Sequence, residues 1–303
     1  YSPEMIKKKR FDGTYLKGLH HFVRIIPYFM PTRSEATIYF EQELDITECL
    51  KFLKAFNRNL DPLKPKLTFF QLFLCAGVRT VATRPMLNRF VSGKNYYQRN
   101  EIIFNFVAKR RLTDEGEEIN VKIAFSPFET LHTIGEKITD EIRTATREDG
   151  TGGEDINALL MKFPRWFLTL FFKTLRFLDF HNSSPKSIMK VDPFYSTVFL
   201  TNVGSIGIDT PFHHNYEWGT CGLFVALGKV RREWRPDKDG NPQQRDLVKV
   251  TFTYDDRMAD GVYVGKSINI FRSFVENPES LAGKPDISEE MLKELMLKDC
   301  PPR

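Results

Sequence analysis

The segment from residue 68 to residue 83 limits most strongly what this chain of 303 residues can fold into. Thr68 is placed to cap a helix, and the residues after it are apolar nearly all the way round the helix until Pro85 stops it. A helix without a polar face has to be buried. The rest of the chain must therefore supply elements that enclose this helix.

Several other segments have the apolar patterns that are typical of strands and helices. The predicted strands are 36–44, a segment around Phe90, 101–110, 119–125, 196–200, 222–230 and 247–255. Further helices are predicted at 129–147, 156–180 and 288–298, after Asp260, and after Asp45, where the sequence is typical of a capping box. No repeat or linker divides the chain, so we expect one α+β domain.

The composition excludes several classes of protein. Hydrophobic residues make up 41% of the chain and charged residues 27%, which excludes a disordered chain. The formal net charge of +5 is small for this length, so it suits an anionic small-molecule substrate and gives no reason to expect nucleic-acid binding. The basic run Lys7–Arg10 is interpreted as a solvated arm.

The cysteines indicate a reducing environment. Cys49, Cys75, Cys221 and Cys300 form no CxxC pair and have no histidine at metal-ligand spacing, so we expect no metal site. Cys49 and Cys75 fall on apolar faces of predicted helices, as reduced core thiols do. The sequence has no apolar run long enough to cross a membrane and no signal-peptide pattern, and we therefore expect a cytoplasmic protein.

The segment 163–180 is rich in Trp, Leu and Phe but is interrupted by Arg165, Lys173 and Arg176. This pattern is typical of an amphipathic helix. Such a helix either packs in an oligomer or lies on a membrane surface. Packing in a trimer is favoured, because globular chains bury apolar stripes more often than they dock them on lipid.

The most specific motif runs from Asp255 to Gly261 and is followed by a segment with helical periodicity. Two other runs precede it, Arg84–Phe90 and Thr201–Gly207. Together with the order of predicted elements, these runs resemble the chloramphenicol acetyltransferase superfamily, and most closely the acyltransferase catalytic core of the 2-oxo acid dehydrogenase complexes. The resemblance covers about residues 20–283.

This resemblance implies a fold, an assembly and a substrate. The implied fold is an α+β two-layer sandwich of a mixed β-sheet and helices, with an N-terminal arm at 1–19, an acyltransferase-like catalytic domain at 20–283 and a C-terminal helical tail at 284–303. The implied assembly is a homotrimer with an active site between neighbouring subunits. We expect no lipoyl domain in the chain and no permanently bound cofactor, with coenzyme A or acyl-CoA as the thioester substrate and an acceptor that the sequence does not identify.

Asp256 departs from the pattern of the superfamily. The members carry a histidine at this place in the motif, and that histidine is the general base. An ordinary aspartate titrates at about pH 4 and is a poor base for an alcohol. The sequence therefore predicts a coenzyme A-dependent acyltransferase-like protein with an atypical or degenerate active site; the alternative is a non-catalytic trimeric scaffold or ligand-binding relative.

The resemblance also assigns roles to residues near Asp256. Asp260 matches the acid that braces the active-site loop through an arginine, for which Arg24 and Arg33 are the candidates. Asp260 is equally suited to cap the helix that begins at Gly261. Arg257 is interpreted either as an ion-pair residue or as a solvated side chain.

Thr201 matches a position at which the superfamily has a hydroxyl that stabilises the tetrahedral oxyanion; alternatively, Thr201 simply ends a strand. His213 and His214 are the candidates for a substitute base, because a neutral imidazole has suitable basicity. The competing interpretation, two locally hydrogen-bonded histidines at a surface or interface, is favoured because most histidines are not catalytic.

Overall fold

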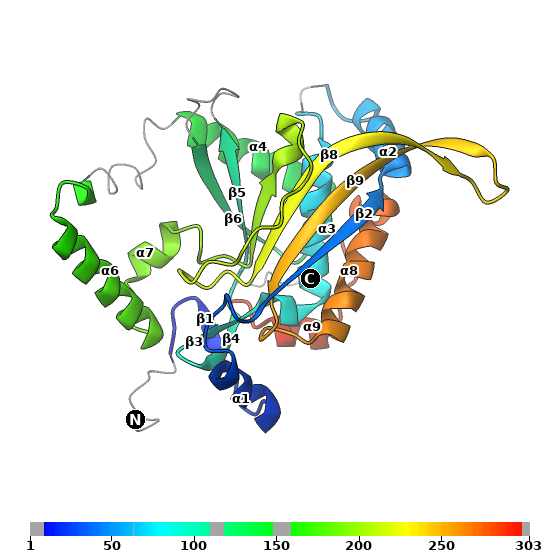
Figure 1. The fold of residues 1–303 in the computed structure, drawn as a ribbon. Helices are drawn as coiled ribbons and strands as arrows, with labels where there is room; N and C mark the ends of the chain where they lie inside the picture. The colour runs from blue at the N-terminus through cyan, green and yellow to red at the C-terminus, as the bar shows by residue number, and fades with distance from the viewer. Residues whose placement is uncertain (1–8, 63, 110–117, 148–158, 299–303) are drawn as a thin grey trace.

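The computed structural model describes residues 9–62, 64–109, 118–147 and 159–298 (Figure 1). Its main element is a six-stranded mixed sheet in the order β2-β9-β8-β7-β5-β6. The strands are β2 (Thr37–Asp45), β5 (Ile102–Lys109), β6 (Glu118–Phe125), β7 (Val198–Asn202), β8 (Leu223–Pro236) and β9 (Pro242–Asp255). β7 runs parallel to both β5 and β8, and the other neighbours are antiparallel. The predicted strand segments are confirmed, although β8 and β9 are longer than expected.

The extra length of β8 and β9 forms a hairpin that projects beyond the sheet (Figure 1). Its turn contains Gly240, which has a φ of 85°, and Asp237 accepts hydrogen bonds from the backbone of Asp239 and Asn241. A positive φ favours glycine, and an aspartate that bonds the backbone two residues on is typical of a turn. The turn is therefore encoded locally.

Helices cover one face of the sheet, which confirms the predicted two-layer α+β arrangement (Figure 1). They are α2 (Thr47–Arg58), α3 (Phe69–Thr83), α4 (Leu131–Arg147) and α8 (Gly261–Glu276). α3 lies at the centre with Leu72, Leu74 and Ala76 fully buried, as its all-round apolar sequence predicts. Thr68 and Gln71 form a reciprocal capping box at its start.

The expected capping box at Asp45 is wrong. Asp45 is the last residue of β2, and the N-cap of α2 is Ile46, which makes no side-chain bond. The Asp45 carboxylate accepts instead from the backbone N–H of Thr47 at 3.0 Å. Asp45 thus bonds the N–H two residues later and not three, because β2 continues as far as Asp45, where the capping box requires the N-cap of the helix.

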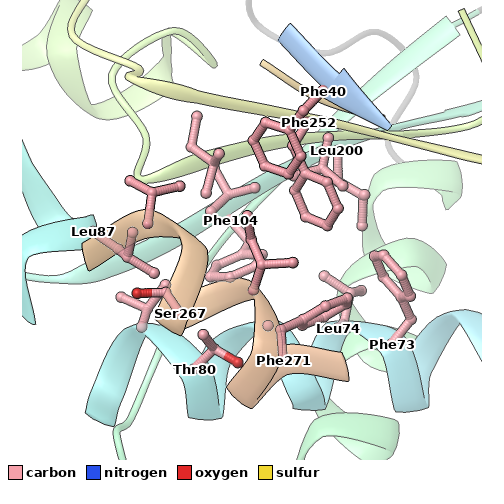
Figure 2. Close-up of a pocket in the computed structure, with 17 residues that line it drawn as sticks. Phe40, Phe73, Leu74, Thr80, Leu87, Phe104, Leu200, Phe252, Ser267 and Phe271 are labelled. Atoms are coloured by element: carbon pink, nitrogen blue, oxygen red, sulfur yellow. The ribbon is translucent and has the colours of Figure 1, made fainter. Parts of the chain in front are cut away.

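An apolar cavity of about 60 Å³ lies between the sheet and helices α3 and α8 (Figure 2). Phe252 and Phe271 are among its lining side chains, and its polar lining consists of Thr80 and Ser267. The hydroxyls of Thr80 and Ser267 donate to carbonyl groups of their own helices. The cavity therefore offers no titratable group for chemistry.

A second sheet of three strands, β1 (Gly13–Tyr15), β4 (Asn95–Arg99) and β3 (Arg89–Ser92), was not expected as a unit. β1 brings the predicted arm into the fold. Arg10 is buried, and its guanidinium bonds Asp12 at 2.8 Å and Asp179 at 3.2 Å. Arg10 is thus not solvated; Lys9 is exposed, and Lys7 and Lys8 lie outside the described residues.

The C-terminal segment also packs on the main core. α9 (Glu289–Leu295) carries Leu295, which is fully buried, and Ile287 just before the helix is buried in the same cluster. Glu294 pairs with Arg89 at 2.9 Å. The described residues after 283 therefore pack on the same hydrophobic core as the residues before it.

The aromatic segment forms a shorter helix than expected. α6 (Arg165–Phe180) begins after Pro164, which has an extended conformation and no N–H to continue a helix upstream. A short helix that was not predicted, α7 (Lys186–Val191), follows it. Figure 1 shows α6 at the periphery, away from the helices that cover the sheet.

No helix among the described residues is long and apolar enough to cross a membrane.

Candidate functional site

The turn after β9 holds Asp256. The backbone N–H of Asp256 donates to the carbonyl of Ala36 at 2.8 Å, and that of Asp255 donates to the carbonyl of Gly222 at 2.8 Å. The N–H of Met258 closes the turn on the Asp255 carbonyl at 2.9 Å. The residues just before β2 and β8 therefore fix the backbone at this position, and Asp256 is held at a defined place with a half-buried side chain.

Asp255 and Arg257 form a buried bidentate ion pair. Arg257 Nε lies 2.8 Å from Asp255 Oδ1, and its terminal nitrogen lies 2.7 Å from Oδ2. Arg33 Nε lies 3.8 Å from the same carboxylate. The prediction that Arg257 is an ion-pair residue is confirmed. Arg33 braces the loop through Asp255 rather than through Asp260.

The two arginines also tie distant segments together. Arg257 donates to the carbonyl of Met30 at 3.1 Å, and Arg33 donates to the carbonyls of Tyr216 and Gly219 at 2.6 and 2.7 Å. Every carbonyl here belongs to irregular backbone, which needs such donors when it is buried. The sequence analysis did not predict that Asp255 is an ion-pair partner. An acid two residues before Arg257, at the end of a buried strand, was a signal that could have indicated it.

Asp260 is the N-cap of α8. Its carboxylate accepts from the backbone N–H of Tyr263 at 2.9 Å, directly before Gly261 begins the helix. This confirms the capping interpretation. Among the ion pairs between described residues, none joins Asp260 to Arg24 or Arg33, so the predicted arginine partner is wrong for the single chain. Arg24 is exposed on α1 (His21–Phe29).

The pKa of Asp256 is raised above that of an ordinary aspartate. Partial burial is the largest cause, followed by the negative charge of Asp255; Asp260 acts in the same direction, and a hydrogen bond with Tyr254 acts against it. A raised pKa makes this carboxylate a somewhat stronger proton acceptor than an unperturbed one.

Thr201 lies near the end of β7 on the face of the sheet away from the helices. Val198 and Leu200 belong to the main core, so Phe199 and Thr201, which alternate with them, face the opposite side. The Thr201 side chain is half-buried, and its hydroxyl makes no hydrogen bond with any described residue. The hydroxyl is therefore available to a ligand or to another chain.

A tight turn follows Thr201. Gly204 approaches the backbone of β8 so closely that a Cβ there would overlap the carbonyl of Gly228. Gly207 adopts a φ of 80°. Both glycines are thus required by the backbone, and they fix the direction in which the chain leaves Thr201.

His213 and His214 lie in the loop 208–220, which crosses the same open face of the sheet. Thr253 of β9 donates its hydroxyl to the His213 carbonyl, and the His213 ring stacks on Phe224 with ring centroids 3.9 Å apart. Phe224 stacks in turn on Phe199 at 4.7 Å. His213 is therefore held on aromatic rings that β8 and β7 contribute.

Both histidines have a defined tautomer. His213 Nδ1 lies 3.2 Å from the carbonyl oxygen of His214, and His214 Nδ1 lies 3.1 Å from that of Asn215. A carbonyl can only accept, so in each contact Nδ1 is the donor, and on a neutral ring Nε2 is then the nitrogen with the free lone pair. Burial lowers the pKa of His213, which keeps the ring neutral at pH 7.

These three candidates do not meet within one chain. Thr201 is level with Thr251 across the sheet, so the spacings of strands and residues place Asp256 roughly 20 Å from Thr201. His213 is level with Phe199, and the same spacings place it roughly 12 Å from Thr201. One chain therefore presents Thr201, His213 and Asp256 as separate parts of a surface.

A polar cavity of about 360 Å³ adjoins the ion-paired loop. Arg33, Arg257, Lys94 and Arg176 contribute cationic side chains to its wall, together with Trp218. The acids in the same wall have other partners: Asp179 pairs with Arg10, and Glu217 accepts from the backbone and hydroxyl of Ser34 at 2.7 and 2.8 Å. Arg33 and Arg257 are likewise paired with Asp255, so Lys94 and Arg176 are the cations of this wall that suit an anionic ligand.

The described residues contain no cluster of three or more His, Cys, Asp or Glu side chains that could hold a metal ion. Cys49, Cys75 and Cys221 are buried free thiols, while Cys300 lies outside the described residues. Burial raises the pKa of Cys49 and of Cys75 to about 12, so neither thiol is a ready nucleophile.

Residues 188–282 match the family model of the 2-oxoacid dehydrogenases acyltransferase (catalytic domain). A probable dihydrolipoamide acetyltransferase from Listeria monocytogenes 4b F2365 superposes with a TM-score of 0.55 at 14% identity, over 86% of this chain and 94% of that one. A chloramphenicol acetyltransferase superposes with a TM-score of 0.53 at 11% identity, over 87% of this chain and 99% of that one. The fold is that of the chloramphenicol acetyltransferase-like superfamily. No curated protein has a matching sequence.

The acetyltransferase of Azotobacter vinelandii also has this fold, with a TM-score of 0.54 at 13% identity over 88% of this chain and 94% of that one. A serine, a histidine and an asparagine of that protein have been investigated for roles in its catalytic mechanism. The histidine and the asparagine lie four positions apart there, which is the separation of Asp256 and Asp260 here. At these low identities the likeness establishes the fold alone.

Proposed function

We propose that this chain is an acyl-CoA-dependent acyltransferase that works as a homotrimer, with His213 as the proton acceptor and Thr201 as the oxyanion donor. The observation that carries the proposal is the tautomer of His213. Its Nδ1 donates to the His214 carbonyl, so its Nε2 is an unprotonated base on the same open face of the sheet as the unpaired Thr201 hydroxyl. The family match at residues 188–282 supports acyl-transfer chemistry.

His213 and Thr201 together account for the proton transfers and the oxyanion in acyl transfer from coenzyme A to an acceptor. Nε2 of His213 removes the proton from the acceptor hydroxyl or thiol, whose oxygen or sulfur attacks the thioester carbonyl carbon. The Thr201 hydroxyl donates to the oxyanion of the tetrahedral intermediate, where one such donor contributes a factor of about 10²–10³ in rate. The carbon–sulfur bond then breaks, and the coenzyme A thiolate recovers the proton from the imidazolium.

A trimer supplies what one chain lacks. Because His213 and Thr201 are roughly 12 Å apart in one subunit by the strand spacings, they act together only when each meets its counterpart in a neighbouring subunit. One relative of this fold is the cubic core of the pyruvate dehydrogenase multienzyme complex, an assembly of many subunits, which supports an oligomeric unit. The cationic wall of the polar cavity suits the phosphates of coenzyme A.

The test measures, by chromatography, the free coenzyme A formed from acetyl- and longer acyl-CoA with dithiothreitol as the acyl acceptor. We expect His213→Gln to lower kcat by about 10²–10⁴ and Thr201→Val by about 10²–10³. His214→Gln is the matched control, and it should retain activity if His213 is the base. Loss in His214→Gln with retention in His213→Gln would move the role to His214. Full activity in both single variants and in the double variant would contradict a histidine base.

Mixed trimers test the contact between copies. Co-expressed Thr201→Val and His213→Gln chains, separated by different tags, should recover activity, since some contacts then combine an intact Thr201 with an intact His213. No recovery in trimers of confirmed mixed composition would place both residues in one subunit.

Asp256 favours one alternative, a non-catalytic trimer, because it occupies the place at which the superfamily has its base. In that case trimers bind coenzyme A without turnover of any acyl thioester. If Asp256 is itself the proton acceptor, Asp256→Ala abolishes turnover while His213→Gln does not.

A further inference from the structure

Helix α6 contributes little to the core of the described chain. Leu175 is its one buried residue, and Phe167, Phe171 and Leu178 on the same side are half-buried. The opposite side carries Trp166, Leu170, Phe177 and Phe180, which recur at helical spacing and are exposed. We call this set, together with Arg165, Lys173 and Arg176, the α6 face.

The α6 face combines apolar side chains with cations and contains no acid. Arg165, Lys173 and Arg176 are all exposed. Asp179 is the helix's one acidic residue, and it is half-buried and engaged by other groups. Its carboxylate pairs with Arg10 at 3.2 Å and accepts from the Ser184 hydroxyl at 3.1 Å.

Arg10 also brings the start of the chain to the same place. Its guanidinium bonds the carbonyl of Asp179 at 3.2 Å and the side chain of Asn182 at 3.0 Å, so it pins the C-terminal end of α6 to the fold. Lys9, the preceding residue, is exposed, and the sequence before it continues with Lys7 and Lys8. Arg10 thereby holds the start of the described chain at the C-terminal end of α6.

We propose that the α6 face docks the protein on the surface of a bilayer that contains anionic phospholipid. The helix has 16 residues and would be about 24 Å long, and its three cations prevent it from entering the hydrocarbon core. Such a helix lies in the interface, with Trp and Phe at the headgroup boundary and Lys and Arg among the lipid phosphates.

Charge complementarity selects this occupant. An apolar contact with another protein would bury Arg165, Lys173 and Arg176 against a surface that must supply matching acids, and lysine is depleted at the centres of such contacts. An anionic membrane supplies negative charge along the whole length of the helix. This docking goes beyond acyl transfer and does not depend on which residue is the base.

Co-sedimentation with extruded vesicles tests the proposal. Vesicles of phosphatidylcholine with 30% phosphatidylglycerol should bind the full chain in 50 mM NaCl, binding should fall at least about tenfold in 500 mM NaCl, and pure phosphatidylcholine should bind weakly. Arg165→Glu/Lys173→Glu and Trp166→Ser should each weaken binding to the anionic vesicles at least about tenfold.

Trp234 provides a matched control, because it is 68% exposed on the distant β8 hairpin and Trp166 is 69% exposed on α6. Trp234→Ser should bind as the unaltered chain does. Light scattering on each variant reports its assembly. The proposal is overturned if the unaltered chain stays in the supernatant with anionic vesicles at low salt, or if the α6 variants bind undiminished. It is equally overturned if those variants lose only their assembly, since α6 would then cover a second copy.

Discussion

Asp255 and Arg257 lie two residues apart on one turn and hold each other through two buried hydrogen bonds, of 2.8 and 2.7 Å. Arg33 reaches the same carboxylate from a segment more than 200 residues earlier in the chain. The turn that presents Asp256 is therefore braced by two arginines. None of these contacts uses the side chain at position 256.

Removal of one member of this ion pair should destabilise the fold strongly. Asp255→Ala leaves Arg257 buried without its partner, and breaking a buried pair in this way costs about 3–5 kcal/mol. Urea unfolding followed by circular dichroism measures the loss. Arg272→Ala is the control, because Arg272 pairs with Glu276 on the half-exposed side of α8 and should lose less than about 0.5 kcal/mol. Equal, small losses in both variants would contradict a bracing role for Asp255.

Asp260 should contribute as a helix cap. Asp260→Ala removes the acceptor for the Tyr263 N–H and should cost about 1 kcal/mol in the free energy of unfolding, while Asp260→Asn keeps an acceptor oxygen and should cost less. Thermal and urea unfolding of both variants check this. A loss of several kcal/mol in Asp260→Asn would instead indicate that the negative charge has a buried partner, for example in the assembled trimer.

The phenylalanines divide into core residues and surface residues. Phe271 packs edge-on against Phe73 and Phe252 beside the apolar cavity (Figure 2), with ring centroids 4.9 and 5.9 Å away. Phe271→Ala should therefore cost about 3–5 kcal/mol. Phe177→Ala on the exposed side of α6 should change the stability by less than about 0.5 kcal/mol in the absence of lipid. A large effect at Phe177 without lipid would mean that a second copy covers it.

Local signals in the sequence predicted much of this fold. Thr68 and Asp260 cap their helices through donors three residues away, and the run up to Pro85 contains the information for its own burial and termination. The three-stranded sheet escaped prediction because β1 pairs with β4 more than 80 residues later. Short strands carry weak periodicity, and only tertiary pairing makes them strands.

The site was predictable in its parts and not in their arrangement. Motifs and residue types are enough to name Asp256, Thr201 and His213 as candidates, whereas the partner of Arg33 depends on how β9 meets the segment before β2. The tautomer of His213 likewise depends on a carbonyl in a loop whose path is set by Thr253. Such contacts join residues that no local pattern relates.

Asp256 should destabilise the fold at neutral pH. Its pKa is raised in the folded state, first by partial burial and then by the charges of Asp255 and Asp260, so the folded chain binds its proton more tightly than the unfolded chain does. This favours the fold at a pH below the ordinary value of about 4, and the advantage is lost as the pH rises through the folded-state pKa. Above that pKa the ionised carboxylate carries the full penalty.

Asp256→Asn removes the charge and should therefore stabilise the protein at pH 7, by less than about 1 kcal/mol because a half-exposed carboxylate is screened by water. The gain should shrink as the pH falls toward 4, and it should also shrink in 0.5 M NaCl. Urea unfolding at a series of pH values measures it, with Asp209→Asn as a control at an exposed acid. A loss of stability in Asp256→Asn at pH 7 would show that the carboxylate has a cationic partner. That partner would then come from a neighbouring subunit, since no cation is among the groups of the described chain that shift the pKa of Asp256.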